Sequence, residues 1–304
     1  MCSPDGKSVT RMTLERRNKR VGLLFFLPAG LVIFGIIVYP LLVSLVTSFT
    51  AYSFIDPSYR VFVGFDNYLA IFYDIYFWNS IYVVSKFVVV VVSLEFVLGF
   101  TIALLLNRDI KAKGVFYTIL SVPMVMAPVA VALIWRVFLH PELGIVNYLL
   151  AQLRIRPVNW LGSSSVAFWT VVMVDIWHQV SFMILVLLAG LVSLPRDVYE
   201  AASIDGASMA QRFTHITLPL MKPVILVALL LRTIFGFRTF DLVYVLTRGG
   251  PGVATDMTSY YIYRHTFMGL NIAESTAASY LFLLFNLVVV VFLYRALRLK
   301  EEVS

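Results

Sequence analysis

Long runs of apolar residues dominate this chain and leave it few possible folds. Six such runs can be drawn, roughly over 21–48, 78–106, 115–139, 166–194, 220–246 and 275–297. Each exceeds the ~18 residues that a helix needs to cross a hydrocarbon core of ~30 Å. Backbone groups in lipid must pair within their own segment, and the alternating pattern of a membrane barrel is missing. The sequence therefore predicts an all-α membrane protein with six transmembrane helices.

Composition agrees with an integral membrane protein, since 60% of residues are hydrophobic and 13% are charged. The single cysteine, Cys2, excludes an internal disulfide and a cysteine-based metal cluster, and we predict no metal site. The first run is too long for the core of a signal peptide. We therefore expect a basic N-terminal tail over 1–20, a six-span domain over 21–297 and a C-terminal tail over 298–304.

The distribution of basic residues predicts the orientation in the membrane. Fifteen lysines and arginines fall on the side that holds both chain ends, against five on the other side. Such an excess marks the cytoplasmic side, so both termini and the loop over 195–219 are expected there, in a multi-pass cytoplasmic-membrane protein surrounded by lipid. The net charge of +7 is therefore explained by orientation, and no nucleic-acid partner is predicted.

The loop between the fourth and fifth runs carries clear helix signals. Pro195 suits the first position of a helix, and Gly206 suits a left-handed stop. Ser208 and Gln211 form an S-x-x-Q capping box for a second short helix, which Pro219 is expected to end. The small side chains of this loop favour close approach by another protein, which indicates a docking element. On composition alone, an ordinary polar connector remains the alternative.

The same loop resembles a motif of ATP-binding-cassette importer permeases, which reads E-A-A, three residues, G, nine residues, I-x-L-P. Every fixed position of that motif matches here. The resemblance implies the six-span fold of type I importer permeases, with coupling helices at 195–219 that sit in a cleft of the ATPase. The residues that it assigns to ATPase coupling are Glu200, Ala201, Ala202, Asp205, Gly206, Ile216, Leu218 and Pro219.

Further stretches are similar to carbohydrate-uptake permeases, namely 62–68, 123–150 and 237–251. The last resembles the first permease subunit of maltose- and trehalose-type importers. One departure is Val83-Val84, where that family often has Asn-Thr. The resemblance implies a second homologous permease subunit, two cytoplasmic ATPase subunits that bind ATP and Mg²⁺, and an extracytoplasmic sugar-binding protein. The sequence DGKS at 5–8 lacks the first glycine of a phosphate loop, so no cofactor is expected on this chain.

Polar residues within the spans are candidates for a substrate site, because charge is costly inside a membrane. Three predicted helices place such groups and aromatic rings at similar depth, which suits sugar hydroxyls and apolar sugar faces. The span-four and span-five positions also match those that line the sugar cavity in maltose-type permeases. The predicted substrate residues are Asp175, His178, Gln179, Phe182, Phe237, Arg238, Phe240, Asp241, Tyr244 and Asn286. In the alternative, Asp175 and Arg238 pair structurally, and Arg232 pairs with Glu95 or another acid.

Three function classes fit these observations. The first is the permease subunit of an importer for a di- or oligosaccharide, powered by a separate ATPase and not itself an enzyme. The second is an ion-coupled secondary transporter that uses intramembrane Asp and His, which is less favoured because no paired broken helices are visible in the sequence. The third is a membrane enzyme built on Asp175, His178 and Ser181, but neighbouring turns of one helix rarely bring a nucleophile to its base.

Overall fold

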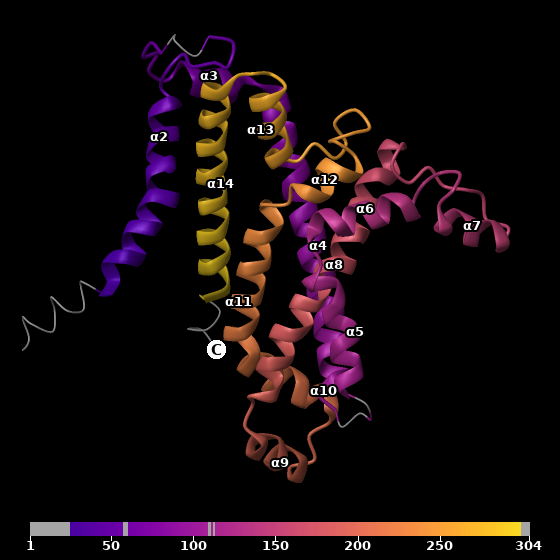
Figure 1. Cartoon of the computed structure of the whole chain (residues 1–304). Coiled ribbons are helices and arrows are strands. Elements are labelled where there is room, and N and C mark those ends of the chain that lie inside the picture. The colour runs from indigo at the N-terminus through magenta and orange to yellow at the C-terminus, as the bar shows by residue number, and fades with distance from the viewer. Residues whose placement is uncertain (1–24, 57–59, 109–110, 112, 299–304) are drawn as a thin grey trace, which may run out of the picture.

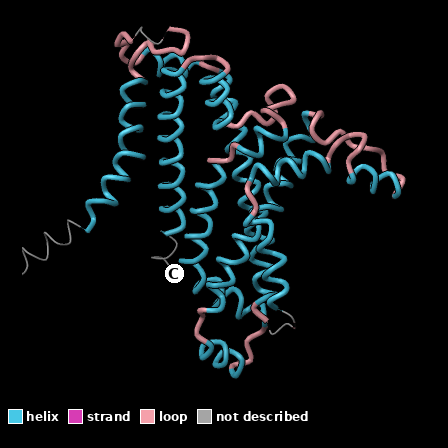
Figure 2. The backbone as a smooth tube through the Cα atoms, viewed as in Figure 1, coloured by secondary structure: helices cyan, strands magenta, loops and turns pink. Residues whose placement is uncertain are grey.

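The computed structural model describes residues 25–56, 60–108, 111 and 113–298. These residues form helices and no β-strand, apart from an isolated bridge between Thr50 and Phe62. Long helices run side by side, and short helices and loops close both ends (Figures 1 and 2). The all-α prediction is confirmed. The predicted tail 1–20 and residues 299–304 lie outside the described residues.

A pair of long helices forms the centre of the bundle, α4 (Ile75–Leu106) and α8 (Ser164–Val192). Their contact is close at Gly99, where an added Cβ would lie 2.8 Å from Cγ of Met183 and 3.3 Å from the backbone nitrogen of Ile184. Buried valines and phenylalanines of both helices, including Val84, Phe87, Val91, Phe168 and Val171, fill the core beside them.

The third predicted span is not a single straight helix. It consists of α5 (Lys113–Val125) and α6 (Pro128–Phe138), which meet at an angle of 96°. Pro128 disfavours a helical conformation at Ala127, which is extended with φ −63° and ψ 135°. The prolines at 123 and 128 predict a kink or a helix start within the run over 115–139, and Pro128 does start α6.

The fifth predicted span is also interrupted. A continuous helical run begins at α10 (Met209–Arg212), passes through the π-helix η2 (Phe213–Thr217) and continues as α11 (Leu218–Phe237). Non-helical residues 238–240 then separate it from α12 (Asp241–Leu246), which packs against α6. Pro219 lies in the first turn of α11, so the prediction that it ends the preceding helix was wrong.

The segment 195–219, called the coupling segment below, lies at one end of the molecule (Figure 1). Its first helix is α9 (Arg196–Ile204), with Pro195 at the N-cap and not at the predicted first helical position. Gly206 has a φ of +75°, as expected for a left-handed stop. Both hydrogen bonds of the predicted capping box between Ser208 and Gln211 are present.

The first and last spans lie beside each other at the edge of the bundle. Residues 25–33 are α-helical and continue through η1 (Phe34–Val38) and α2 (Tyr39–Thr47). The first span is 0% buried along its most apolar window, and the hydroxyl of Tyr280 on α14 (Ile272–Arg298) donates to the carbonyl of Leu41 at 2.5 Å. Its exposed face is thus left to lipid or another chain.

Short helices close the end opposite the coupling segment. They are α3 (Asp66–Tyr73) and α13 (Thr258–Phe267), while α7 (Ile145–Gln152) projects to one side beyond α6 (Figure 1). Five helices among the described residues are long and apolar enough to span a membrane, and the bent pair α5–α6 makes six. The described chain ends at residues 25 and 298 both point toward the side of α9 (Figure 1). The expected six-span architecture is confirmed.

The close contact at Gly99 makes a testable prediction. Gly99→Val should lower the unfolding free energy by about 1–3 kcal/mol, because the added methyl groups force Met183 and the α8 backbone away. Thermal unfolding of the purified protein in detergent would measure it. Gly30→Val is the matched control, since no atom lies within 4 Å of a Cβ at Gly30. Equal melting temperatures for both variants would contradict the close packing of α4 and α8.

Candidate substrate pocket and coupling segment

A cavity of about 140 Å³ lies where both interrupted spans meet α8. It is called the pocket below, and its lining residues are Pro128, Asp175, His178, Gln179, Arg232, Phe235, Arg238, Thr239, Phe240, Asp241 and Leu242. Irregular backbone at membrane depth is tolerated where it lines a cavity, and the break at 238–240 does so here. The helix breaks therefore build the pocket.

Six of the ten predicted substrate residues line this pocket, as the preceding list shows. Two more lie just behind the lining. Phe182 packs edge-on against Phe235 with ring centres 5.9 Å apart, and Tyr244 stacks on Phe240 at 5.4 Å. The rings of Phe240 and Tyr244 also contact Tyr263 of α13, a residue the sequence reasoning did not select.

The other two predicted residues face elsewhere. Phe237 is 3% exposed and packs edge-on against Phe282 and Phe285 of α14. The amide nitrogen of Asn286 donates to the carbonyl of Phe282 within its own helix. Position along a span does not give the direction in which a side chain points.

His178 fixes the bend of the third span. Its Nε2 lies 3.1 Å from the carbonyl oxygen of Met126, and its Nδ1 lies 3.0 Å from Nε2 of Gln179. A carbonyl only accepts, so we assign the ring proton to Nε2, and Nδ1 accepts from the amide. The hydroxyl of Ser181 donates to the carbonyl of Leu120. Side chains of α8 thus bind one carbonyl within α5 and one in the break between α5 and α6.

The three acidic and basic groups at the centre of the bundle form one buried cluster. Arg232 of α11 donates Nε and Nη2 to the carboxylate of Glu95 on α4, and Nη2 also donates to Asp175 on α8. Exposures are 1% for Arg232, 0% for Glu95 and 3% for Asp175. The expected pairing of Arg232 with Glu95 is confirmed. The alternative pairing of Asp175 with Arg238 was wrong, because Asp175 pairs with Arg232.

The coupling segment presents its predicted residues to the outside. Glu200, Ala201, Asp205 and Gly206 are exposed in the first half, and Leu218 and Pro219 in the second. Ala202 and Ile216 are half-buried. Two side-chain contacts hold the segment in shape, between the hydroxyls of Tyr199 and Thr217 at 2.8 Å and from Arg212 to the hydroxyl of Ser203 at 2.9 Å.

Two exposed apolar residues on this segment were missed by the sequence reasoning. Ile204 is 87% exposed and Met209 is 71% exposed, on either side of Gly206. Beside them lies a hollow of about 370 Å³ lined by residues that include Asp205, Gln211 and His215. In the sequence, the signal for Ile204 and Met209 was their position next to the glycine turn.

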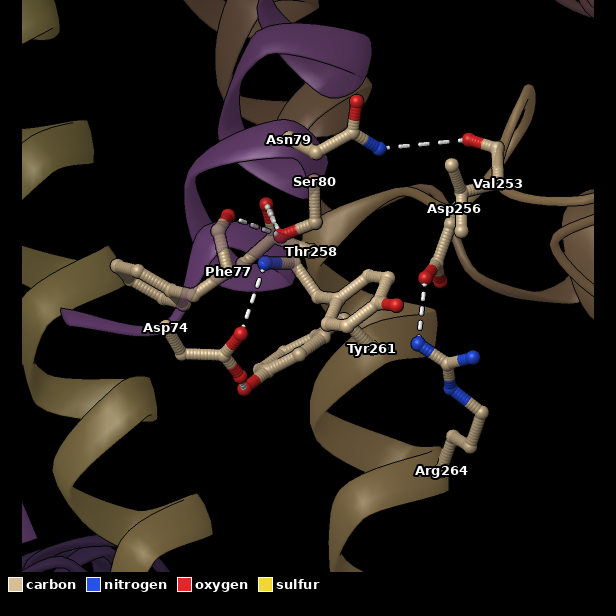
Figure 3. Close-up of polar contacts among 10 residues, drawn as sticks. Asp74, Phe77, Asn79, Ser80, Val253, Asp256, Thr258, Tyr261 and Arg264 are labelled. Atoms are coloured by element: carbon tan, nitrogen blue, oxygen red, sulfur yellow. Dashed lines mark hydrogen bonds and ion pairs between the residues drawn. The ribbon is translucent and has the colours of Figure 1, made fainter. Parts of the chain in front are cut away.

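A polar cluster joins α13 to the beginning of α4 at the other end of the molecule (Figure 3). Arg264 pairs with Asp256 at 2.6 Å, and the hydroxyl of Tyr261 donates to Asp74 at 2.5 Å. Burial raises the pKa of the Asp256 carboxyl to about 6; Arg264 opposes this rise and Asp74 adds to it. Burial and the hydrogen bond to Asp74 also raise the pKa of Tyr261.

Comparison with known proteins identifies the class of this chain. Residues 95–300 match the family described as binding-protein-dependent transport system inner membrane component. The chain belongs to this family: it is a multi-pass inner-membrane permease of the ATP-binding-cassette importer class, a transport subunit and not an enzyme. The resemblance noted in the coupling segment is confirmed.

Several particular proteins are similar to it. The trehalose/maltose transport system permease protein MalF of Thermococcus litoralis is 42% identical over 256 residues, which cover 84% of this chain and 86% of that protein. The sulfoquinovosyl glycerol transport system permease protein SmoG of Agrobacterium fabrum is 34% identical over 99% of this chain and 98% of its own. A bacterial alginate ABC transporter, solved with an alginate pentasaccharide-bound periplasmic protein, superposes with a TM-score of 0.82 at 27% identity, covering 94% and 97% of the two chains.

The family assignment decides between the three function classes. It excludes the membrane enzyme and the ion-coupled transporter. No paired broken helices were visible in the sequence, but the third and fifth spans are both interrupted in the structure. Broken spans around a central cavity are thus shared by this permease and by secondary transporters.

The raised pKa of Asp256 predicts a pH dependence of stability. Between about pH 4 and 6 the folded protein holds more protons at Asp256 than the unfolded chain, so the unfolding free energy should fall as pH rises through this window. The loss amounts to at most about 3 kcal/mol, at ~1.4 kcal/mol for each pKa unit.

Melting temperatures of the wild type and of Asp256→Asn from pH 4.5 to 7 would measure this effect. The variant cannot ionise there, so it should gain stability relative to the wild type as pH rises. Asn79→Ala, which removes the uncharged contact to the carbonyl of Val253, should follow the wild type at every pH. A constant difference between the wild type and Asp256→Asn would contradict the prediction.

Proposed function

We propose that this chain is a permease subunit of a sugar importer, which passes a di- or oligosaccharide across the cytoplasmic membrane and is driven by ATP hydrolysis on a partner. The observation that carries the proposal is the exposed coupling segment with its complete motif from Glu200 to Pro219. ATP and Mg²⁺ belong to two cytoplasmic ATPase subunits, and Ile204 and Met209 supply apolar contact to one of them.

The pocket contributes one part of the sugar path. A cavity of about 140 Å³ is smaller than the ~300 Å³ at which ordinary ligand sites begin. A second homologous permease subunit therefore completes it, and the exposed first span supplies further surface for that pairing. The ring of Phe240 suits an apolar sugar face, and Arg238, Gln179 and Asp241 suit its hydroxyls. Relatives named for trehalose and maltose transport support this substrate class.

An extracytoplasmic sugar-binding protein delivers the substrate to the opposite end. The permease in the similar alginate transporter was solved with such a protein. The excess of basic residues places both termini and the coupling segment in the cytoplasm, so α3, α7 and α13 face outward. The turn at Arg248–Gly252, which contains backbone at positive φ beside α12, lies on that side and is available for the contact.

The transport cycle follows from the continuity of the helices. Closure of the ATPase pair moves the coupling segment, and the unbroken helical run from Met209 to Phe237 carries this movement to the break at 238–240. The pocket then opens outward as one rigid group of helices turns against another.

Reversal of one charge tests the coupling segment. Glu200→Arg should abolish ATP-driven uptake and reduce retention of the ATPase during purification, because the exposed carboxylate lies at the centre of the proposed contact. Membrane insertion should remain normal. Glu142→Arg is the matched control, since Glu142 is also exposed but lies at the outward end. Wild-type uptake by Glu200→Arg would count against the proposed contact.

Removal of one ring tests the pocket. Phe240→Ala should raise the sugar concentration for half-maximal uptake roughly tenfold, corresponding to ~1.4 kcal/mol of lost ring contact. Concentration-dependent uptake into proteoliposomes of the complete importer would measure it. Phe292→Ala removes a ring that is 72% exposed on α14 and should leave uptake unchanged. An unaltered half-saturation for Phe240→Ala would place the sugar elsewhere.

A further inference from the structure

Arg232 has two acidic partners that differ in how firmly they are held. Glu95 receives two hydrogen bonds, from Nε and Nη2, in the side-on geometry that fits a guanidinium to a carboxylate. Asp175 receives one hydrogen bond, from Nη2, which Glu95 also uses. Because Asp175 is held by one hydrogen bond and Glu95 by two, the contact with Asp175 is the easier to exchange.

The contact that is easier to exchange is also the one at the pocket. Asp175 and Arg232 are among the residues that line the cavity, whereas Glu95 lies behind them on α4. A substrate hydroxyl that donates to Asp175 competes with Nη2 of Arg232 for the same carboxylate. Occupation of the pocket therefore weakens the Arg232–Asp175 contact and leaves the Arg232–Glu95 pair in place.

Arg232 stands on the helical run that begins in the coupling segment. The run from Met209 through η2 and α11 has no break before Phe237. At ~1.5 Å per residue, Arg232 lies roughly 35 Å from Met209 along this helix. The contact with Asp175 ties the helix to α8 at the pocket, so its release changes how freely the helix moves at both ends.

Stability alone does not explain such a cluster. A buried ion pair often contributes less than apolar residues of the same volume, because both charges must leave water. In a membrane interior this cost is high, and charged groups retained there usually have a function.

We propose that Arg232 is a positioning residue that transmits pocket occupancy to the coupling segment by exchanging its contact with Asp175. In the empty pocket the contact holds α11 against α8 and restrains the ATPase. A bound substrate takes over Asp175 and releases the helix. This inference rests on the proposed function for the identity of the sugar, but its main test needs no sugar.

The test is the rate of ATP hydrolysis by the complete importer in lipid nanodiscs, without sugar. Asp175→Asn weakens the contact to Arg232 and keeps the side-chain shape. It should raise the sugar-free rate at least threefold and reduce the further stimulation by trehalose or maltose. Asp175→Glu, which keeps a carboxylate, should restore most of the restraint. A purely structural role predicts a lower yield of folded complex with an unchanged ratio of stimulated to sugar-free rates.

The matched control is Lys86→Gln. The ammonium group of Lys86 on α4 lies 4.4 Å from the ring centre of Phe168 on α8. This charged contact also links α4 to α8, the helices that carry Glu95 and Asp175, but it lies away from the pocket. Its removal should leave the sugar-free rate unchanged. If Asp175→Asn does not assemble, Arg232→Lys decides, because a point charge lacks the planar fork that serves two carboxylates.

The outcomes separate this inference from the proposed function. If Asp175→Asn hydrolyses ATP without sugar at the wild-type rate, this result overturns the proposal that Arg232 exchanges its contact with Asp175. Where that variant fails to assemble, a wild-type rate in Arg232→Lys overturns it. A raised rate in Lys86→Gln as well would assign the effect to loosened helix packing and would also overturn it. If neither sugar stimulates the wild type, the sugar assignment fails, while the sugar-free rate of Asp175→Asn still tests the role of Arg232.

Discussion

The structure depends on one constraint: backbone groups within a hydrocarbon core must find partners inside the protein. This constraint makes long helices of the apolar runs and permits interruptions only where other groups compensate. The bend between α5 and α6 is compensated by His178 and Ser181 of α8. The same helix carries Asp175 and Gln179, which line the cavity beside the bend. One surface of α8 therefore both binds the carbonyls near the bend and lines the pocket.

The interruption after α11 completes this arrangement. It ends a helix that begins in the coupling segment, and it turns Arg238, Thr239 and Phe240 into the pocket. The surface that meets the proposed ATPase and the surface that meets the proposed substrate therefore belong to one continuous helical run. Arg232, buried between Glu95 and Asp175, is the point at which that run is held to two other spans.

Local signals were sufficient for much of this structure. The capping box at Ser208 and the left-handed turn at Gly206 depend on neighbours in sequence, and both were predicted. Pro128 indicated a kink or a helix start but not a bend of 96°, and the break at 238–240, which contains no proline, was not predicted. The packing of Phe237 and Asn286 away from the pocket was not predicted, since helix rotation is set by contacts between distant segments. The pairing of Arg232 with Asp175 was missed for the same reason.

The central claim is that this permease moves solute only through an energy source on another polypeptide. Solute accumulation in proteoliposomes that contain both permease subunits and the binding protein, with and without the ATPase pair, measures it most directly. The account predicts that accumulation against a gradient requires the ATPase subunits and ATP. Accumulation driven by an ion gradient in their absence would contradict it.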